Sequence, residues 1–287
     1  MNSLTITQAL LAAQSQGLDR LDAQLLMLHA LVRPVHDRAW LLAHDGDSLT
    51  PAELVTFEAA VQRRTTGEPV AYITGHKEFF GLDVQVDARV LVPRPDTETL
   101  VEWALDVLAA MDAPDLSILD LGTGSGAIAL ALKHARPNLM VSATDASEGA
   151  LQVAKSNAQR LQLDVQFSQG SWLAGLPRPG QRFHAIISNP PYIGSMDKHL
   201  AALKHEPIQA LTSGTDGLKD IRSIITQAGD HLHADGWLLL EHGYDQAAAV
   251  RELLTAAGFE AVQSRKDLSD IDRCSGGCMA KRPKGLP

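Results

Sequence analysis

The first part of the chain carries apolar residues at helical spacing. Leu21, Leu25 and Leu28 recur at intervals of four and three, which places them along one face of a helix. Further on, Thr50-Pro51-Ala52-Glu53 supplies an N-cap, a proline at the first turn and an acid just inside the helix. We therefore predict a small helical bundle from Met1 to about Arg64.

Partly alternating and β-branched residues replace this pattern after the bundle. The run from Glu78 to Asp87 and the run from Val90 to Val92 together predict a β-hairpin. A helix should follow Pro93-Arg94-Pro95-Asp96-Thr97-Glu98, and Asp96 or Thr97 is its natural N-cap. A solvated linker has little use for so many bulky apolar residues, so we expect this stretch to pack on the next domain near its ligand.

From Leu116 onward, short apolar runs alternate with helical patterns. The expected strands are Ser117–Leu121, Leu139–Thr144, Val165–Ser168, Phe183–Ser188, Trp237–Glu241 and Phe259–Ser264, and the expected helices are Ala127–His134, Glu148–Leu161, Ile221–Leu232 and Gln246–Ala257. This alternation predicts a doubly wound sheet. The expected fold class is α/β, a Rossmann-like sheet with a small N-terminal helical-bundle domain and a β-hairpin linker. We place the boundaries at residues 1–75, 76–95 and 96–287.

Length, composition and charge limit the class of protein but do not indicate a reaction. The 287 residues allow one large domain or two ordinary ones, and 45% hydrophobic with 21% charged residues is typical of a soluble globular protein. A net charge of −9 argues against broad nonspecific nucleic-acid binding, which needs a basic face. Cys274 and Cys278 are the only cysteines, so a disulfide framework is not expected and a reducing compartment is the default. The chain shows neither a signal pattern nor an apolar run of membrane-spanning length, so we expect a cytoplasmic protein.

A glycine-rich loop follows the first expected strand of the sheet. In Asp120-Leu121-Gly122-Thr123-Gly124-Ser125-Gly126, the glycines let the backbone turn sharply and approach a ligand without Cβ clashes. Asp145 ends the next strand, at about the twenty-residue interval expected of a ribose-binding carboxylate. Asp145 or Ser147 would also serve as the N-cap of the helix that begins near Glu148. With the glycine loop beside it, we favour ribose binding for Asp145.

Loops of this kind also occur in nicotinamide dehydrogenases. Gly122-x-Gly124-x-x-Ala127 satisfies the relaxed dinucleotide fingerprint. Two features favour another ligand. Asp120 on the loop would repel a pyrophosphate and attract a cationic, zwitterionic ligand. A dehydrogenase also needs no asparagine with twin prolines after the fourth strand.

That asparagine begins Asn189-Pro190-Pro191-Tyr192, which closes the buried strand Phe183–Ser188. Two prolines fix φ and supply no backbone donor, so the chain leaves the strand along a stiff path. The Asn189 carboxamide and the Pro190 carbonyl are therefore expected at the strand's carboxyl end, where ligands bind in open parallel sheets. Asn-Pro is also common turn chemistry, so a plain turn is the alternative when the tetrapeptide is considered alone.

Together these motifs resemble known ones. The loop from Asp120 to Gly126 resembles motif I of S-adenosylmethionine (AdoMet)-dependent methyltransferases of the Rossmann-like class. The tetrapeptide from Asn189 to Tyr192 resembles that of the members that methylate nitrogen in planar systems: exocyclic amines of adenine, cytosine or guanine, and glutamine amides. The resemblance implies AdoMet as the cofactor, S-adenosylhomocysteine (AdoHcy) as the product and no metal.

The region before the sheet narrows the resemblance. Gly67 to Gly75, Glu78-Phe79-Phe80, Val92 to Glu98 and Leu238 to Gly243 resemble the protein-glutamine N5-methyltransferases of bacterial peptide-chain release factors, the PrmC or HemK family. With the leucine-rich N-terminus, the resemblance covers nearly the whole chain. It implies methylation of the glutamine in the Gly-Gly-Gln motif of class 1 release factors, with the N-terminal helical domain recognising the substrate. We expect a monomer that binds its protein substrate transiently and has no stable contact with nucleic acid or membrane.

Carried onto this sequence, the resemblance implies the residues of the site. The implied cofactor-binding residues are Asp120, Gly122, Thr123, Gly124, Ser125, Gly126, Asp145, Trp172 and Asn189. The implied substrate-binding residues are Asn189, Pro190, Pro191 and Tyr192, of which Asn189, Pro190 and Tyr192 would be catalytic. Asp145 is expected on the ribose and Trp172 near the adenine, although Trp172 would also suit a core aromatic after the third strand.

The chain departs from the family pattern at two places. Ser171 stands where relatives usually carry an acid suited to the adenine amino group, so this contact is weaker, water-mediated or made elsewhere. Where relatives read roughly Glu-Arg-Val, the chain has Asp272-Arg273-Cys274-Ser275-Gly276-Gly277-Cys278-Met279. Two thiols without further clustered ligands fall short of a four-ligand zinc site, so we expect an edge strand there.

Three other functions stay open at this point. A sister class methylates a glutamine of a large-subunit ribosomal protein and shares the core motifs. An adenine or cytosine methyltransferase would act on a flipped base and would want a basic target-recognition region. A degenerate fold that binds AdoMet or a partner without catalysis is the third. Ser171 and the unusual C-terminal strand keep it open, whereas Asn189 and the glycine loop argue against it.

Overall fold

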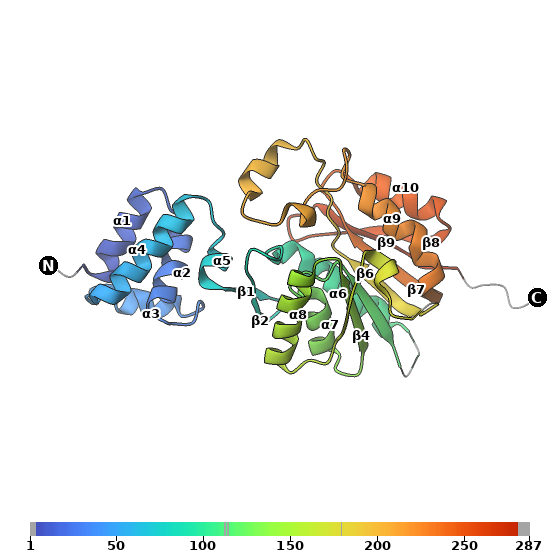
Figure 1. The fold of residues 1–287 in the computed structure, drawn as a ribbon, viewed down its shortest axis with the longest axis horizontal. Coiled ribbons are helices and arrows are strands. Elements are labelled where there is room, and N and C mark those ends of the chain that lie inside the picture. The colour runs from blue at the N-terminus through green and yellow to red at the C-terminus, as the bar shows by residue number, and fades with distance from the viewer. Residues whose placement is uncertain (1–3, 112, 114, 179, 281–287) are drawn as a thin grey trace, which may run out of the picture. The chain divides into compact units, whose positions relative to one another are not determined.

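The structure is a computed structural model and describes residues 4–111, 113, 115–178 and 180–280. The chain divides into two compact units, Met1–His76 and Lys77–Pro287 (Figure 1). Each unit has a hydrophobic core of its own. The division lies beside the residue 75 boundary that the sequence suggests, and most of the hairpin linker groups with the second unit.

The first unit is a helical bundle. Its helices are α1 (Ile6–Ser15), α2 (Arg20–Ala30), α3 (Arg38–Ala43), α4 (Pro51–Thr65) and α5 (Val70–Thr74). The capping residues Thr50 and Glu53 start α4 as expected, each accepting a hydrogen bond from the other's backbone N–H. The stripe expected on α2 faces the core only in part, because Leu28 is fully buried whereas Leu21 is 48% exposed. Leu26 and Met27, which the leucine spacing alone did not single out, are fully buried as well.

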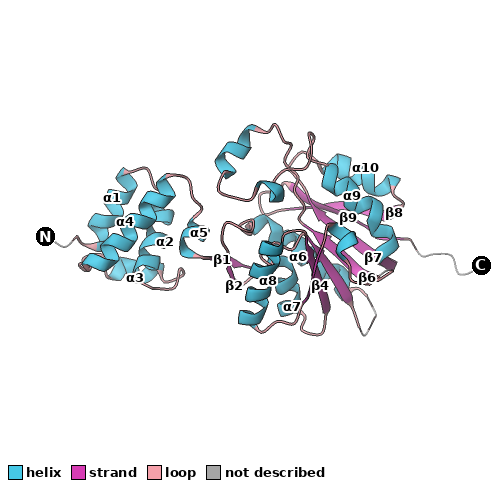
Figure 2. Cartoon of the chain, in the orientation of Figure 1, coloured by secondary structure: helices cyan, strands magenta, loops and turns pink. Residues whose placement is uncertain are grey.

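The second unit is a seven-stranded sheet with helices on both faces (Figure 2). Its strands are β3 (Ser117–Leu121), β4 (Met140–Asp145), β5 (Gln166–Gln169), β6 (Phe183–Ser188), β7 (Leu232–Glu241), β8 (Phe259–Lys266) and β9 (Asp272–Met279). Its α-helices are α6 (Glu98–Ala109), α7 (Ala127–Ala135), α8 (Glu148–Leu161), α9 (Lys219–Ala228) and α10 (Ala247–Ala256). The predicted α/β class with a Rossmann-like sheet is confirmed. The helix expected at Ile221–Leu232 ends earlier, as α9, because Leu232 already begins β7.

Strand order places the site. The order is β5-β4-β3-β6-β7-β9-β8, and β3 to β7 run parallel. The chain moves from β3 outward to β4 and β5, then returns to the other side of β3 with β6. The point where the direction reverses is therefore between β3 and β6, and the carboxyl ends of these two strands flank the crevice in which such sheets bind ligands.

The hairpin lies earlier in the chain than expected. It is formed by β1 (His76–Phe79) and β2 (Leu82–Gln85), and no strand covers residues 90–92. The backbone N–H of Val92 donates to the Glu206 carboxylate, 3.1 Å away, and the Val90 and Val92 side chains are buried. The prediction of a strand at residues 90–92 was wrong because its apolar pattern reflects burial of an irregular segment.

The expectation of an edge strand at the C-terminus was also wrong. β9 lies between β7 and β8 and is antiparallel to both. A Cβ on Gly276 would lie 2.6 Å from the Leu238 carbonyl oxygen, and one on Gly277 would lie 2.9 Å from the Phe259 Cβ. The two glycines thus let both neighbours close on the strand. Cys274 and Cys278 are free thiols, and Cys274 is fully buried.

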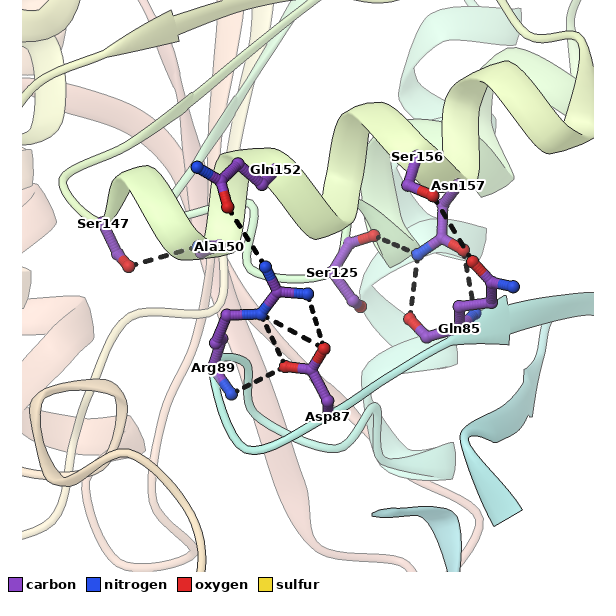
Figure 3. Close-up of polar contacts among 9 residues, drawn as sticks. All are labelled: Gln85, Asp87, Arg89, Ser125, Ser147, Ala150, Gln152, Ser156 and Asn157. Carbon is purple, nitrogen blue, oxygen red and sulfur yellow. Dashed lines mark hydrogen bonds and ion pairs between the residues drawn. The ribbon is translucent and has the colours of Figure 1, made fainter. Parts of the chain in front are cut away.

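A buried asparagine holds the hairpin to the sheet domain. Asn157 on α8 is fully buried, and its side-chain oxygen accepts from the Gln85 N–H at 2.8 Å. Its Nδ2 donates to the carbonyl oxygens of Gln85 and Ser125, both at 2.9 Å, as Figure 3 shows. One side chain therefore ties β2, α8 and the end of the glycine loop together.

Replacing Asn157 should measurably destabilise the second unit. We expect Asn157→Ala to lower the free energy of unfolding by about 2–4 kcal/mol, because each buried group left without a partner costs about 1–3 kcal/mol. The matched control is Ser156→Ala on the same helix, whose hydroxyl is exposed and lies 3.4 Å from the Gln85 side chain. The free energy of unfolding of Ser156→Ala should stay within about 0.5 kcal/mol of the wild-type value. Equal urea midpoints for the two variants would contradict this role of Asn157.

Candidate active site

The glycine loop and the tetrapeptide meet at the reversal point of the sheet. Leu121 at the end of β3 pairs in register with Ser188 at the end of β6. The Ser188 hydroxyl donates to the Leu121 carbonyl oxygen at 2.7 Å, and both side chains are fully buried. The next residues, Gly122 on one strand and Asn189 on the other, are thereby held side by side.

These two segments line one cavity of about 270 Å³, which we call the switch-point cavity. Its lining includes Gly122, Gly124, Asp145, Trp172, Asn189 and Pro191 from the expected site residues. Arg89, Val90 and Leu91 also line it, which confirms that the apolar stretch before the sheet packs near the ligand site. Val92 and Arg94 of the same stretch bond to Glu206, from the segment whose Pro207 and Gln209 form another part of the wall.

The glycine loop is shaped for close approach. Gly122 and Gly124 have φ of 71° and 56°, in the left-handed region that favours glycine. A Cβ on Gly122 would lie 3.3 Å from the Trp172 ring, so the indole packs directly over the loop. The loop backbone and the indole both line the switch-point cavity.

Asp145 is held at the end of β4 with both oxygens oriented. One oxygen accepts from the Gly124 N–H at 2.8 Å and the other from the Ser147 N–H at 2.9 Å. Burial raises the pKa of Asp145, while these backbone hydrogen bonds act in the opposite direction. The N-cap of α8 is Ser147, whose hydroxyl accepts from Ala150, so Asp145 is free of that role.

Trp172 is fixed by a residue that the sequence did not indicate. Its indole N–H donates to the Asp220 carboxylate at 3.2 Å, and Asp220 lines the switch-point cavity. Asp220 lies in the first turn of α9, where acids are common because they interact favourably with the helix dipole. Its position in the sequence therefore gave no indication of a role at the site. Ser171, where the family resemblance led us to expect an acid, also lines the cavity. An acid is therefore present near Trp172, but it comes from another element.

Asp120 lies beneath the loop and does not line the cavity. It is fully buried. Its Oδ2 accepts two hydrogen bonds, one from the Thr123 hydroxyl at 2.6 Å and one from the Ala129 N–H at 3.2 Å. Burial raises the pKa of Asp120 to about 7, with the charge of Asp145 acting in the same direction. The expectation that Asp120 presents a negative charge to the ligand therefore needs correction: the carboxyl holds the loop from within.

Several other expected residues shape the site from behind its surface. Thr123 and Ser125 are buried in the loop, Gly126 begins α7, and Pro190 is buried; none of these four lines the switch-point cavity. Tyr192 lines a second cavity of about 450 Å³ instead, together with Met196 and Tyr244. The tetrapeptide thus contributes Asn189 and Pro191 to one cavity and Tyr192 to the other.

The two polar side chains of the tetrapeptide are each anchored. The Asn189 Nδ2 donates to the Thr97 hydroxyl at 3.2 Å, and the Tyr192 hydroxyl donates to Glu241 Oε1 at 3.2 Å. Glu241 ends β7 and is buried; burial raises its pKa to about 7, while Thr97, Arg273 and Tyr192 favour its charged form. Burial and the charge of Glu241 raise the pKa of Tyr192, so Tyr192 stays a neutral phenol.

The residues of the switch-point cavity fit AdoMet. The Asp145 carboxylate is a strong acceptor for ribose hydroxyls, and the Trp172 ring offers an aromatic face to a nucleobase. The glycines leave open the space that a Cβ would fill. Within residues 4–111, 113, 115–178 and 180–280, no group of three His, Cys, Asp or Glu side chains could hold a metal ion. In the same part of the chain, no helix has the length and apolar character needed to cross a bilayer.

The fold and the site define a class I methyltransferase, a class that implies the use of AdoMet. One family model, described as the PrmC N-terminal domain, matches residues 3–75, and another, described as the methyltransferase small domain, matches residues 103–216. A solved structure of a methyltransferase from Pyrococcus furiosus superposes with a TM-score of 0.53 at 19% identity, over 78% of this chain and 98% of that one. At this identity the likeness shows the fold alone.

Curated relatives identify the family. The release factor glutamine methyltransferase of Coxiella burnetii is 46% identical over 255 residues, covering 88% of this chain and 90% of the relative. That of Burkholderia pseudomallei is 48% identical over 273 residues, covering 92% and 93%. The chain belongs to the release factor glutamine methyltransferase family, and the resemblance found in its sequence is confirmed.

The buried Asp120 predicts a pH-dependent difference in stability. Because its pKa is about 7 in the folded protein and 3.8 in the reference state, the folded protein holds a proton that the unfolded chain releases between these values. Its contribution to stability therefore falls as pH rises from about 4 to 7. Asp120→Asn removes this dependence, so the free energy of unfolding of the variant minus that of the wild type should increase between pH 5 and pH 8. Urea unfolding at both values measures it, and a constant difference would contradict the buried proton.

Proposed function

We propose that the chain transfers a methyl group from AdoMet to the side-chain amide nitrogen, N5, of the glutamine in the Gly-Gly-Gln motif of class 1 release factors. The observation that carries the proposal is that Asn189 and Pro191 share one cavity wall with Gly122 and Asp145. Residues suited to a planar amide and residues suited to AdoMet thus face the same space. The activity for which the relatives are named supports a release factor as the protein substrate.

A glutamine amide nitrogen is a weak nucleophile because its lone pair is delocalised into the carbonyl. AdoMet supplies the matching electrophile, a methyl group activated by its sulfonium. The Asn189 side-chain oxygen and the Pro190 carbonyl would each accept one N–H of the glutamine amide. Two acceptors hold the nitrogen in place and stabilise the positive charge that develops on it during transfer.

The site needs no dedicated general base. The methylated nitrogen is strongly acidic, so its proton leaves readily after transfer. Tyr192 does not compete for that proton, since its raised pKa keeps the phenol neutral and its hydroxyl already donates to Glu241. Its ring lines the second cavity, so packing of this ring against the planar amide would require the glutamine to lie where the two cavities approach each other at the tetrapeptide.

Asp145, Trp172 and the glycine loop would hold AdoMet. Asp145 would accept from the ribose hydroxyls, Trp172 would lie near the adenine, and Gly122 to Gly126 would leave room for the rest of the cofactor. We further propose a cytoplasmic monomer, with the N-terminal helical unit contributing to recognition of the release factor.

The test of the function is location of the methyl group. Purified protein with labelled AdoMet would be given unmodified release factor and, separately, large-subunit ribosomal proteins, and peptide mass spectrometry would locate the added mass. We expect label on the Gly-Gly-Gln glutamine. Label only on a ribosomal protein would show that the substrate is different, and no label on either protein would overturn the proposed function.

Asn189→Ala should cut turnover while leaving the cofactor site in place. Loss of one preorganised contact costs roughly 2.7–4 kcal/mol of barrier, or about 100- to 1,000-fold in kcat. Calorimetry should find AdoHcy affinity changed far less, because Asp145 and Trp172 remain. The matched control is Asn138→Ala, which alters an exposed asparagine outside the cavity and should keep wild-type turnover. Turnover of Asn189→Ala within a factor of two of wild type would remove Asn189 from the mechanism.

A further inference from the structure

Thr97 occupies the N-cap position of α6 without capping it. Its backbone is αR and its side chain makes no capping hydrogen bond, although the sequence predicted Asp96 or Thr97 as the N-cap. The side chain is 4% exposed, and its hydroxyl lies against the catalytic tetrapeptide instead. A residue that looks like a helix cap therefore has its hydroxyl committed elsewhere.

The hydroxyl of Thr97 interacts on two sides. On one side its oxygen accepts from the Asn189 Nδ2 at 3.2 Å. On the other side it favours the ionised form of the Glu241 carboxylate, whose Oε2 is buried without a hydrogen-bond partner among the described residues and is open to accept a proton. A hydroxyl has a single proton to donate, so a Thr97 that donates toward Glu241 is left as an acceptor for Asn189.

We propose that Thr97 is a positioning residue that sets which way the Asn189 carboxamide faces. With Nδ2 bound to Thr97, Oδ1 is the group left for the substrate amide. The opposite orientation would place two N–H donors of Asn189 against the N–H donors of a glutamine amide, which repel. The inference rests on the proposed role of Asn189 as an acceptor for a glutamine nitrogen.

Glu241 is the fixed point of this arrangement. It is 1% exposed, its Oε1 receives the Tyr192 hydroxyl, and Arg273 lies close enough to favour its charge. Arg273 is itself held by Asp267 at 3.0 Å. Tyr192 therefore bonds to this carboxylate directly, whereas Asn189 bonds to Thr97, which favours the charged form of the same carboxylate.

The test compares Thr97→Val with Thr97→Ser. Valine keeps the shape and removes the hydroxyl, so we expect kcat to fall at least about tenfold while the KM for release factor and the calorimetric Kd for AdoHcy stay within about twofold. Serine keeps the hydroxyl, so its kcat should stay within about threefold of wild type. The matched control is Thr144→Val, because the Thr144 hydroxyl is buried without a hydrogen-bond partner among the described residues.

A second readout does not depend on methyl transfer. ¹⁵N NMR would follow solvent exchange of the Asn189 side-chain N–H protons, assigned by their loss in Asn189→Ala. We expect one Asn189 side-chain proton to be protected from solvent exchange in the wild type and in Thr97→Ser. We expect this protection to be lost in Thr97→Val. If no glutamine is methylated by the wild type but this pattern holds, the proposed function fails and the positioning stands.

Three results would overturn the inference. Equal protection of the Asn189 protons in wild type and Thr97→Val would show that the hydroxyl does not hold the carboxamide. Full turnover of Thr97→Val in an active wild-type background would do the same. Equal losses in Thr97→Ser and Thr97→Val would show that the methyl group, through packing, is what matters.

Discussion

The pairing of β3 with β6 is the constraint on which the site depends. Because Leu121 and Ser188 are in register and their strands are joined by the Ser188 hydroxyl, the glycine loop and Asn189 emerge at neighbouring points. A slip of that register by one residue would turn Ser188 and its neighbours to the other face of the sheet. The methyl donor and the acceptor residues would then no longer face one space.

Three carboxyls around this point, of which Asp120 and Glu241 are buried and Asp145 is half-buried, serve different purposes because their surroundings differ. Asp120 is sealed under the loop and holds it from within. Asp145 has both oxygens fixed by backbone N–H groups at the cavity wall. Glu241 accepts from the Tyr192 hydroxyl of the tetrapeptide, and Thr97 and Arg273 favour its charged form. Burial raises the pKa of all three, and the local donors decide how each carboxyl is used.

Motifs that are contiguous in the chain could be predicted from sequence, whereas partners brought together by folding could not. The loop, Asp145 and Asn189 were found because glycine spacing and strand ends carry local meaning. Thr97 and Asp220 were missed in their roles because each has an ordinary local explanation at a helix start. The internal position of β9 was missed for a related reason: only the close packing of β7 against Gly276 and of β8 against Gly277 reveals it.

The measurement that tests the account most directly is a crystal structure of the chain with AdoHcy and an unmodified glutamine peptide. The account predicts the glutamine nitrogen within about 2.7–3.2 Å of both Asn189 Oδ1 and the Pro190 carbonyl oxygen. It also predicts the AdoHcy ribose on Asp145 in the same cavity. A glutamine amide facing Asn189 Nδ2, or bound away from the switch-point cavity, would contradict it.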